Sequence, residues 1–569
     1  MKQMNLLMVM FCVAGVLNTN AQAVDPMITA KYKQSAPYNN SCPNGTVTGC
    51  GPLAIAQILN MYKMPSHGYG EISYESGKDH KYHINVDFSK INFDWDNILD
   101  EYKDGAYTDA QAKAVADLMY ACGAAMHATY GTSTDVKSYT RILYGLQHYL
   151  HFCVDSRYLF RKFYSTAEWI EMLDKQLRDG HPVLYRGTWF FNDSSAGHMF
   201  VIDGIDTQGA YHINFGNGGS GDKFADINVI NLSGTHSGGR GVCYNASQAM
   251  MTNCYPTPDY EDYPLQRCIL DEPIILNNDI TINNVTVSLG ETFTLSCKLS
   301  NYGEKKENIQ YNYDWALGKD GTFIDFVGQA TLKDDDTVHL NVTLPKNLQD
   351  GTYKLELYSK SDLEPEWAKV WVCAPTNVEV SVTNGKAVVT IPDNHRLDPM
   401  LYLDEDIKEV DNDFAKFVPG RSFALPINNP TTNNFENNIK LDIVADGSLY
   451  SYETKVPVFS QTNTELHILV PQAKVDLEGK NITSVTASYY YDLEKRYVEI
   501  TTTIPSSIET FTNVSGSSTA DIYIYSMNGI VVKKVRAQDV NSQYGAVLKD
   551  LPHGIYIIKE GSKTRKIVI

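Results

Sequence analysis

The stretch TGCGPLAIAQILNMYKMP, residues 48–65, sets the first expectation about the fold. Its apolar residues recur at helical spacing from Cys50 to Tyr62, so we expect a helix that begins at the cysteine. Pro52 fits the first turn of such a helix, where its missing N–H costs nothing. The free N–H groups and the positive end of the helix dipole would face the sulfur and favour the thiolate. Cys50 is therefore a candidate nucleophile, although a cysteine at a helix start, taken alone, is more often a buried structural residue.

Helical and strand patterns continue on both sides of this stretch. Two more runs have helical spacing: Thr108–Ala125, with Thr108 or Asp109 as candidate cap, and Trp169–Arg178. From residue 182 onward the sequence changes to strand-like runs separated by glycine-rich loops. Helices first and an antiparallel sheet afterwards predict an α+β domain over residues 24–257.

Past residue 257 short alternating strands replace the helical periodicity. Thr292–Leu299 alternates strictly, and we expect an immunoglobulin-like β sandwich over residues 270–374. A standard inter-sheet disulfide between Cys297 and Cys373 is not expected, because Cys373 lies on a strand later than that pattern requires. From strand spacing alone we expect a second β sandwich over 375–470 and a C-terminal β domain over 471–569.

The N-terminus has the pattern of a secretory signal peptide. Lys2 is followed by the apolar run Leu6–Leu17 and by Ala-Gln-Ala, which ends at Ala23. We expect a signal peptide over residues 1–23 and an exported protein, either secreted or at the cell surface. The apolar run of 12 residues is too short to cross a bilayer, and no other stretch is long enough, so no transmembrane segment is expected.

The composition is that of an ordinary globular chain of 569 residues, with 43% hydrophobic and 20% charged residues. The balance of 48 Lys+Arg against 67 Asp+Glu argues against a nucleic-acid partner. Of the 10 cysteines, Cys12 leaves with the signal peptide, and the odd remainder implies at least one free or intermolecularly paired thiol. No Cys/His cluster or carboxylate series has ligand spacing, so neither a metal nor a cofactor is expected.

A cysteine nucleophile needs a general base, and sequence context selects His198. This residue begins a strongly apolar strand after a small Ala-Gly pair, so its ring would emerge at a sheet end. Asn214 follows on the next strand and could orient the imidazole, or could be a turn residue at a strand end. His212 lacks the glycine neighbour and is expected to be structural. Gln34, upstream, offers a side-chain amide as a second donor to an oxyanion.

Five sequence blocks together resemble the streptopain-like C10 family of bacterial papain-fold cysteine peptidases. In chain order they are PYNNSCP, TGCGPLAIAQILNMYKMP, PVLYRG, GHMFVIDG and YHINFGNGG. Their order and spacing match over about residues 24–257. The resemblance implies a papain-like α+β catalytic domain followed by all-β domains.

The resemblance also implies roles for six residues. They are Cys50 as nucleophile, His198 as general base and acid, Gln34 as oxyanion donor, Asn214 as the residue that helps orient the histidine, and Gly197 and Phe215 as substrate-binding residues of the cleft. The implied reaction is hydrolysis of internal peptide bonds in proteins or peptides through a thioester acyl-enzyme. A hydrophobic residue would lie next to the cleaved position on its N-terminal side.

Three features depart from the family pattern. Phe215 and Asn217 stand where the family usually has tryptophan, which keeps a ring beside the histidine but changes the cleft wall. Gly-Pro-Leu follows Cys50, where Val-Ala-Thr is common. The expected signal cleavage lies only 11 residues before Gln34, which leaves no room for the family's prodomain. Latency would then come from a separate proteinaceous inhibitor or from the C-terminal domains.

These departures motivate an alternative function. The chain could be a catalytically impaired papain-like surface protein that binds host or neighbouring-cell proteins through its β modules. At the C-terminal end, about 55 residues resemble the β-domain that Bacteroidetes secretion systems use as a sorting signal; the segments concerned are Asp521–Lys534, Leu551–Lys559 and Lys566–Ile569. An ordinary terminal β sandwich is the other interpretation of these segments.

Overall fold

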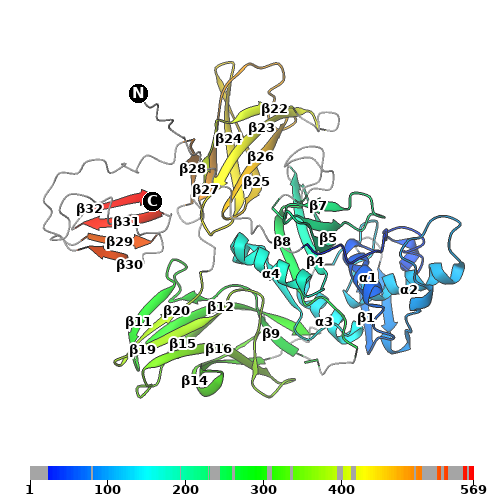
Figure 1. Ribbon diagram of the computed structural model, residues 1–569, viewed down its shortest axis with the longest axis horizontal. Coiled ribbons are helices and arrows are strands. Elements are labelled where there is room, and N and C mark those ends of the chain that lie inside the picture. Colours follow the sequence, from blue (N-terminus) through cyan, green and yellow to red (C-terminus); the bar gives the residue numbers. More distant parts are fainter. Residues whose placement is uncertain are drawn as a thin grey trace, which may run out of the picture.

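The structure is a computed structural model of the chain (Figure 1). It describes residues 23–568 apart from 78–80, 137, 192–193, 229, 231–243, 259–262, 265, 304–309, 334–336, 394–400, 412–417, 492–494, 503–521, 527–530, 536–554 and 561–562. The expected signal peptide, except for Ala23, lies outside the described residues.

The α-helices of the described chain all lie in its N-terminal part (Figure 1). They are α1 (Cys50–Tyr62), α2 (Asp109–Ala125), α3 (Tyr139–Leu150) and α4 (Thr166–Arg178), with short 3-10 turns η1 (Pro43–Gly45), η2 (Phe88–Lys90), η3 (Trp95–Asn97) and η4 (Arg161–Phe163). Helix α1 begins at Cys50, as the sequence predicts. Thr108 rather than Asp109 caps α2, because its hydroxyl accepts from the Gln111 N–H while the Gln111 side chain accepts from the Thr108 N–H. Helix α3 has no counterpart among the predicted elements.

An antiparallel sheet follows the helices, in the order β3-β8-β4-β5-β6-β7. Its strands are β3 (Arg157–Phe160), β4 (Val183–Phe191), β5 (Ser194–Ile205), β6 (Tyr211–Asn214), β7 (Lys223–Ala225) and β8 (Ala246–Thr252). A separate hairpin pairs β1 (Glu71–Ser76) with β2 (Tyr82–Asp87). Helix α1 packs against β5 and α2, and its apolar residues are buried in the core between them. We call residues 24–257 the N-terminal domain.

The first β unit, residues 266–390, contains two sheets that share one core. Its strands are β9 (Gln266–Leu270), β10 (Ile275–Leu276), β11 (Asn284–Ser288), β12 (Thr292–Gly303), β13 (Gln310–Lys319), β14 (Thr322–Lys333), β15 (Thr337–Thr343), β16 (Gly351–Ser361), β17 (Ala368–Lys369), β18 (Trp371–Val372), β19 (Val378–Thr383) and β20 (Lys386–Thr390). The predicted boundary at residue 374 is displaced, because β19 pairs with β16 and β20 pairs with β11. Cys297 and Cys373 are buried free thiols in the structure.

The second β unit, residues 402–500, has two four-stranded sheets around its own core. Its strands are β21 (Tyr402–Leu403), β22 (Lys408–Val410), β23 (Gly420–Asn429), β24 (Phe435–Ala445), β25 (Ser448–Val458), β26 (Thr462–Pro471), β27 (Ile482–Tyr491) and β28 (Arg496–Ile500). The boundary predicted at residue 470 is displaced as well, since β27 pairs with β24 and β28 pairs with β27.

One more sheet, shown in orange and red in Figure 1, follows near the C-terminal end of the chain. It is antiparallel, in the order β30-β29-β31-β32, with strands β29 (Ile522–Ser526), β30 (Val531–Val535), β31 (Ile555–Glu560) and β32 (Lys563–Val568). Among the residues that the structure describes, no helix is long and apolar enough to cross a membrane.

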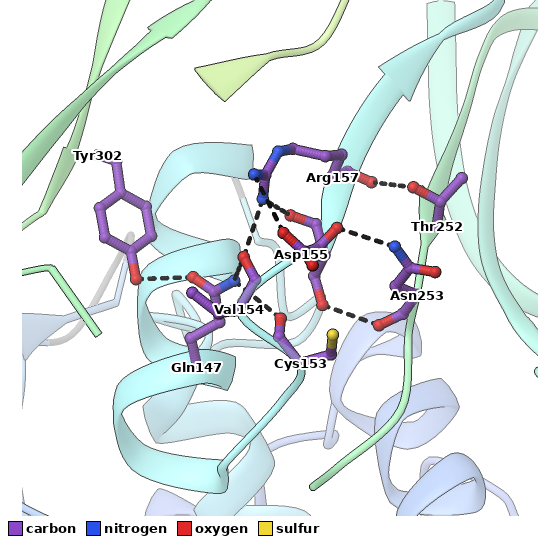
Figure 2. Close-up of polar contacts among 9 residues, drawn as sticks. Gln147, Cys153, Val154, Asp155, Arg157, Thr252, Asn253 and Tyr302 are labelled. Carbon is purple, nitrogen blue, oxygen red and sulfur yellow. Dashed lines mark hydrogen bonds and ion pairs between the residues drawn. The ribbon is translucent and has the colours of Figure 1, made fainter. Parts of the chain in front are cut away.

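The first β unit is fixed to the N-terminal domain by buried polar contacts. Figure 2 shows the hydroxyl of Tyr302, on β12, donating to Oε1 of Gln147 on α3 at 2.7 Å. The Gln147 amide in turn donates to the Cys153 and Val154 carbonyls, each at 3.0 Å. The guanidinium of Arg157 lies 4.3 Å from the centre of the Trp371 ring. The two parts of the chain therefore share a packed and hydrogen-bonded interface.

Candidate active site

Cys50 lies at the first position of α1, directly after Gly49, the N-cap residue of this helix. Gly49 has φ of +88°, and a Cβ there would lie 3.0 Å from Cγ2 of Thr134 and 3.2 Å from its carbonyl oxygen. Only glycine can adopt this positive φ and pack this close to Thr134 without strain. No side chain caps this helix start, so the first N–H groups of α1 remain available to the sulfur. Cys50 is a half-buried free thiol.

His198, on β5, reaches the cysteine from the neighbouring sheet. Its side chain interacts with that of Cys50, and each of the two groups shifts the pKa of the other. Its Nε2 donates to the carbonyl oxygen of Phe215 at 2.9 Å, which leaves Nδ1 for the sulfur. The N–H of Met199, the next residue on β5, donates to Sγ of Cys50 at 3.3 Å. One strand thus supplies both a base and a backbone donor to the thiol.

The pKa values of the two partners move in opposite directions. Burial tends to raise the pKa of Cys50, but the hydrogen bond and charge of His198, together with the N–H groups of Met199 and Gly51, outweigh it, so the net shift is downward. Burial tends to lower the pKa of His198, but the hydrogen bond and charge of Cys50 and the Phe215 carbonyl raise it above its ordinary value. Both shifts favour the form of the pair in which a thiolate lies beside an imidazolium.

Burial also shifts the pKa values of two tyrosines that interact with Cys50. Burial raises the pKa of Tyr244 to about 12, and the negative charge of Cys50 acts in the same direction. Burial also raises the pKa of Tyr158, although its hydrogen bond to Arg186 opposes the shift. Tyr244 precedes β8, whereas Tyr158 and Arg186 lie on β3 and β4. Burial therefore favours the protonated form of both tyrosines.

Of the two roles that the sequence left open for Asn214, its contacts are those of a residue in the turn at the end of β6. Its Nδ2 donates to the Ala30 carbonyl at 3.0 Å, and its Oδ1 accepts from Nε2 of Gln57 at 3.2 Å and from the Gly216 N–H at 3.0 Å. The orienting bond to the histidine comes instead from the Phe215 carbonyl. Asn214 closes the turn after β6 and thereby fixes the backbone that carries this carbonyl, so its link to His198 is indirect.

Gln34 comes close to the cysteine through its backbone. Its carbonyl accepts from the Thr48 N–H at 3.2 Å, two residues before Cys50, and its side chain is half-buried. The structure therefore brings residue 34 to the segment that leads into α1. The role of its amide as an oxyanion donor stays a prediction.

The two predicted substrate-binding residues have different surroundings. Gly197 is exposed on β5, and a Cβ there would have only the Gly187 carbonyl within reach, at 4.0 Å. Phe215 is buried, with 1% of its surface exposed. Its ring lies near-parallel to His198, at 15° and 6.4 Å between centroids, and packs on Phe200 at 5.4 Å. The ring of Phe215 packs on the buried side of His198, whereas Gly197 leaves the backbone next to His198 without a covering side chain.

Sequence reasoning missed Tyr244, which packs on the histidine. Its ring stacks on His198 at 5.1 Å between centroids and 29° between planes. Gly187, which pairs with His198 between β4 and β5, makes this contact fit, because a Cβ at Gly187 would lie 2.1 Å from the Tyr244 carbonyl oxygen. No local motif surrounds Tyr244 in the sequence, and the only signal is a glycine 57 positions earlier on another strand.

The fold and the site define a papain-like cysteine peptidase domain, with the cysteine at a helix N-terminus and the histidine on the adjoining sheet. The sequence model of the Peptidase C10 family matches residues 32–224. The structure of active wild-type interpain A cysteine protease from Prevotella intermedia shares 32% identity, with 41% of this chain and 95% of that chain covered, at a TM-score of 0.38. The chain belongs to the peptidase C10 family.

Two curated relatives extend the comparison. Streptopain from Streptococcus pyogenes is 28% identical over 265 residues, which cover 43% of this chain and 65% of streptopain. Thiol protease/hemagglutinin PrtT from Porphyromonas gingivalis is 23% identical over 407 residues, which cover 67% of this chain and 43% of PrtT. The chain thus spans less than two thirds of the length of either relative.

Proposed function

We propose that this chain is an exported cysteine endopeptidase that uses Cys50 as nucleophile and His198 as general acid and base. The observation that carries this proposal is the N–H of Met199, the residue next to His198, donating to Sγ of Cys50 at 3.3 Å, together with a pKa of Cys50 that His198 lowers and a pKa of His198 that Cys50 raises. A structural cysteine has no need of this arrangement: the buried thiol of Cys254, in the same domain, has its pKa raised to about 12. Membership of the C10 family supports the same conclusion.

The proposed reaction has two halves. In the first, the Cys50 thiolate attacks the peptide carbonyl carbon, and the negative charge on the oxygen is stabilised by the Cys50 N–H and the Gln34 amide. His198 then gives its proton to the amide nitrogen, the C–N bond breaks, and the acyl group stays on sulfur as a thioester. In the second half His198 takes a proton from water, the hydroxide adds to the thioester, and the sulfur leaves as thiolate.

Other residues support these steps. The Phe215 carbonyl and the ring of Phe215 keep the imidazole in place, and Asn214 fixes the backbone of that carbonyl. Gly197 leaves room for an extended substrate backbone beside His198. We propose protein or peptide substrates with a hydrophobic residue next to the cleaved position on its N-terminal side.

Turnover by the full chain tests this proposal. Internally quenched peptides, blocked at both ends, report cleavage of internal bonds. We expect cleavage by the wild type and by the Cys254→Ala control, and none by Cys50→Ala. Cleavage that persists in Cys50→Ala would overturn the proposal. Absence of cleavage by the folded, reduced wild type would favour a binding protein that has lost activity.

Export is part of the proposal and rests on the signal-peptide pattern at residues 1–23. We also propose that the β units are immunoglobulin-like, that a separate inhibitor controls the enzyme, and that the C-terminal sheet acts as a sorting signal. Removal of residues 515–569 followed by cell fractionation tests the sorting role, because an unchanged location rejects it.

A further inference from the structure

The second β unit contacts the N-terminal domain next to the segment that carries Tyr244. Figure 1 shows β24 and β25 beside α4 and the β4–β8 part of the sheet. Glu436, on β24, accepts from the Ser247 N–H at 3.0 Å and from the Ser247 hydroxyl at 2.8 Å. Ser247 lies three residues after Tyr244 and has φ of +47°, a conformation that needs support from its surroundings. Glu436 therefore fixes the strand start that follows Tyr244.

A second contact between the second β unit and the N-terminal domain covers the buried guanidinium of Arg161. Arg161, 1% exposed, donates to the side chains of Gln248 at 2.5 Å and Thr166 at 3.4 Å and to the Ile227 carbonyl at 3.1 Å. Phe459 of the second β unit covers the guanidinium, whose carbon lies 3.6 Å from the ring centre. A buried cation is costly without partners, and an aromatic face over it is stabilising. Phe459 thus seals the Arg161 site from water.

Two polar side chains of the second β unit complete this interface. Asn434 donates to the carbonyls of Arg161 and Tyr164 at 3.1 and 2.8 Å. Ser460, fully buried, accepts from the Thr166 N–H at 2.7 Å, which is one of the free N–H groups at the start of α4. The backbone groups that surround Arg161 are therefore hydrogen-bonded from across the interface.

A chain of contacts leads from this interface to the catalytic histidine. Arg161 bonds Oε1 of Gln248, and Nε2 of Gln248 donates to the Tyr244 carbonyl at 3.3 Å. The Tyr244 carbonyl lies in the space that Gly187 leaves open, and the Tyr244 ring stacks on His198. Interface and histidine are thus linked by packed, hydrogen-bonded side chains with no exposed member, since Gln248 is 2% and Tyr244 9% exposed.

We propose that the second β unit is a positioning part of the active site: through Glu436 and Phe459 it holds the Arg161–Gln248–Tyr244 chain that keeps His198 against Cys50. The proposal rests on the proposed peptidase function for its biological meaning, but the geometry it concerns exists whether or not the chain cleaves proteins. If the β unit is loosened, Tyr244 loses its support and the imidazole gains freedom to leave the sulfur. Less thiolate is then present near neutral pH.

The test measures alkylation of Cys50 by iodoacetamide against pH in the full chain, quantified by mass spectrometry of the peptide that contains Cys50. The test variant is Glu436→Ala combined with Phe459→Ala. The matched control is Glu409→Ala, which removes a carboxylate paired with Arg421 on the other sheet of the same unit. We expect the alkylation midpoint of the test variant to move up by about one pH unit, equal to a tenfold loss of thiolate at fixed pH, with the control unchanged.

For the same test variant we expect kcat for a short peptide substrate to fall while KM stays unchanged, because only the histidine is displaced. Hydrogen exchange of the Ser247 amide shows whether the test variant has lost its contact with Glu436. If that protection is lost and the midpoint of Cys50 alkylation is unchanged, the proposal is overturned. Equal shifts in the test and control variants also overturn it, since they would report general destabilisation. If the double variant fails to fold, Glu436→Ala alone, which removes the acceptor for the Ser247 N–H and hydroxyl, is judged by the same two criteria. Because alkylation does not require turnover, a chain without peptidase activity still gives a decisive result.

Discussion

The Cys50–His198 pair is one coupled proton system, and its two shifts reinforce each other. The thiolate stabilises the imidazolium and the imidazolium stabilises the thiolate, while the Met199 N–H and the Phe215 carbonyl hold each partner in the charged form. Peptidase activity is expected to rise with pH as Cys50 loses its proton and to fall as His198 loses its own.

Removal of the histidine tests this coupling. In His198→Ala the charge and hydrogen bond that lower the pKa of Cys50 are lost, while burial, which raises it, remains. The midpoint of Cys50 alkylation is therefore expected to move upward, to or above the ordinary thiol value of about 8.5. His83→Asn, an exposed residue of β2, is the matched control and leaves the midpoint in place. A midpoint unaffected by His198→Ala contradicts the coupling.

The residues of the site were predictable only where their signal is local. Cys50 lies at the helix start that its sequence block indicates, whereas His198, expected at a strand start, lies inside β5, which begins four residues earlier at Ser194. The sequence left Asn214 either as the residue that orients the histidine or as a turn residue, because the partners of its amide, Ala30 and Gln57, are 184 and 157 positions away. Tyr244 was missed, because only the packing of two strands brings it to His198.

Among the elements, strand β4 is shaped by one close approach. A Cβ at Gly187 would lie 2.1 Å from the Tyr244 carbonyl oxygen and 2.7 Å from the Tyr244 Cβ. A side chain at position 187 would therefore force either β4 or the segment before β8 to move. Gly187→Ala is expected to destabilise the domain by about 1–3 kcal/mol and to lower kcat at the same time. Denaturant unfolding and peptide turnover measure the two effects.

Gly197→Ala is the matched control on the partner strand β5. Its Cβ meets only a carbonyl at 4.0 Å, so we expect unchanged stability and unchanged alkylation of Cys50. Peptide turnover should still fall through a higher KM, because the methyl group enters the space beside the histidine. If Gly187→Ala and Gly197→Ala behave alike, the close approach of Tyr244 to β4 has no special role.

Three helices were predicted and one was missed for a physical reason. The predicted helices α1, α2 and α4 have clear apolar spacing, and α2 and α4 have capping boxes. The sequence of α3, YTRILYGLQHYL, mixes aromatic and β-branched residues with a glycine, which lowers its helix propensity. Gly145 is required by tertiary packing, since a Cβ there would lie 1.7 Å from the Ala125 carbonyl oxygen of α2. That contact cannot be deduced from α3 alone.

At the scale of the whole molecule, the N-terminal domain and the first β unit do not separate cleanly. Ile269, Tyr302 and Cys373 of the first β unit belong to the same core cluster as α1 and α2. The predicted boundaries at 374 and 470 were displaced for a related reason: sheet pairing joins strands far apart in the sequence, and strand spacing alone does not reveal the partner.

A truncation tests the shared core. A chain of residues 24–257 exposes the surface that Ile269, Tyr302 and Cys373 cover, together with the Gln147 amide oxygen that Tyr302 satisfies. We expect a lower unfolding temperature and more aggregation than for residues 24–569, measured by light scattering during heating. Equal thermal behaviour of the two chains would show that the domain is independent of the β units.

Covalent labelling of the full chain by an epoxysuccinyl cysteine-peptidase inhibitor tests the central claim most directly. The proposed site predicts one inhibitor per chain, attached to Cys50, with loss of peptide cleavage in proportion to labelling. The seven other described cysteines are buried and stay unmodified. An unmodified Cys50 in the folded, reduced protein would contradict the proposed peptidase site and favour the binding function.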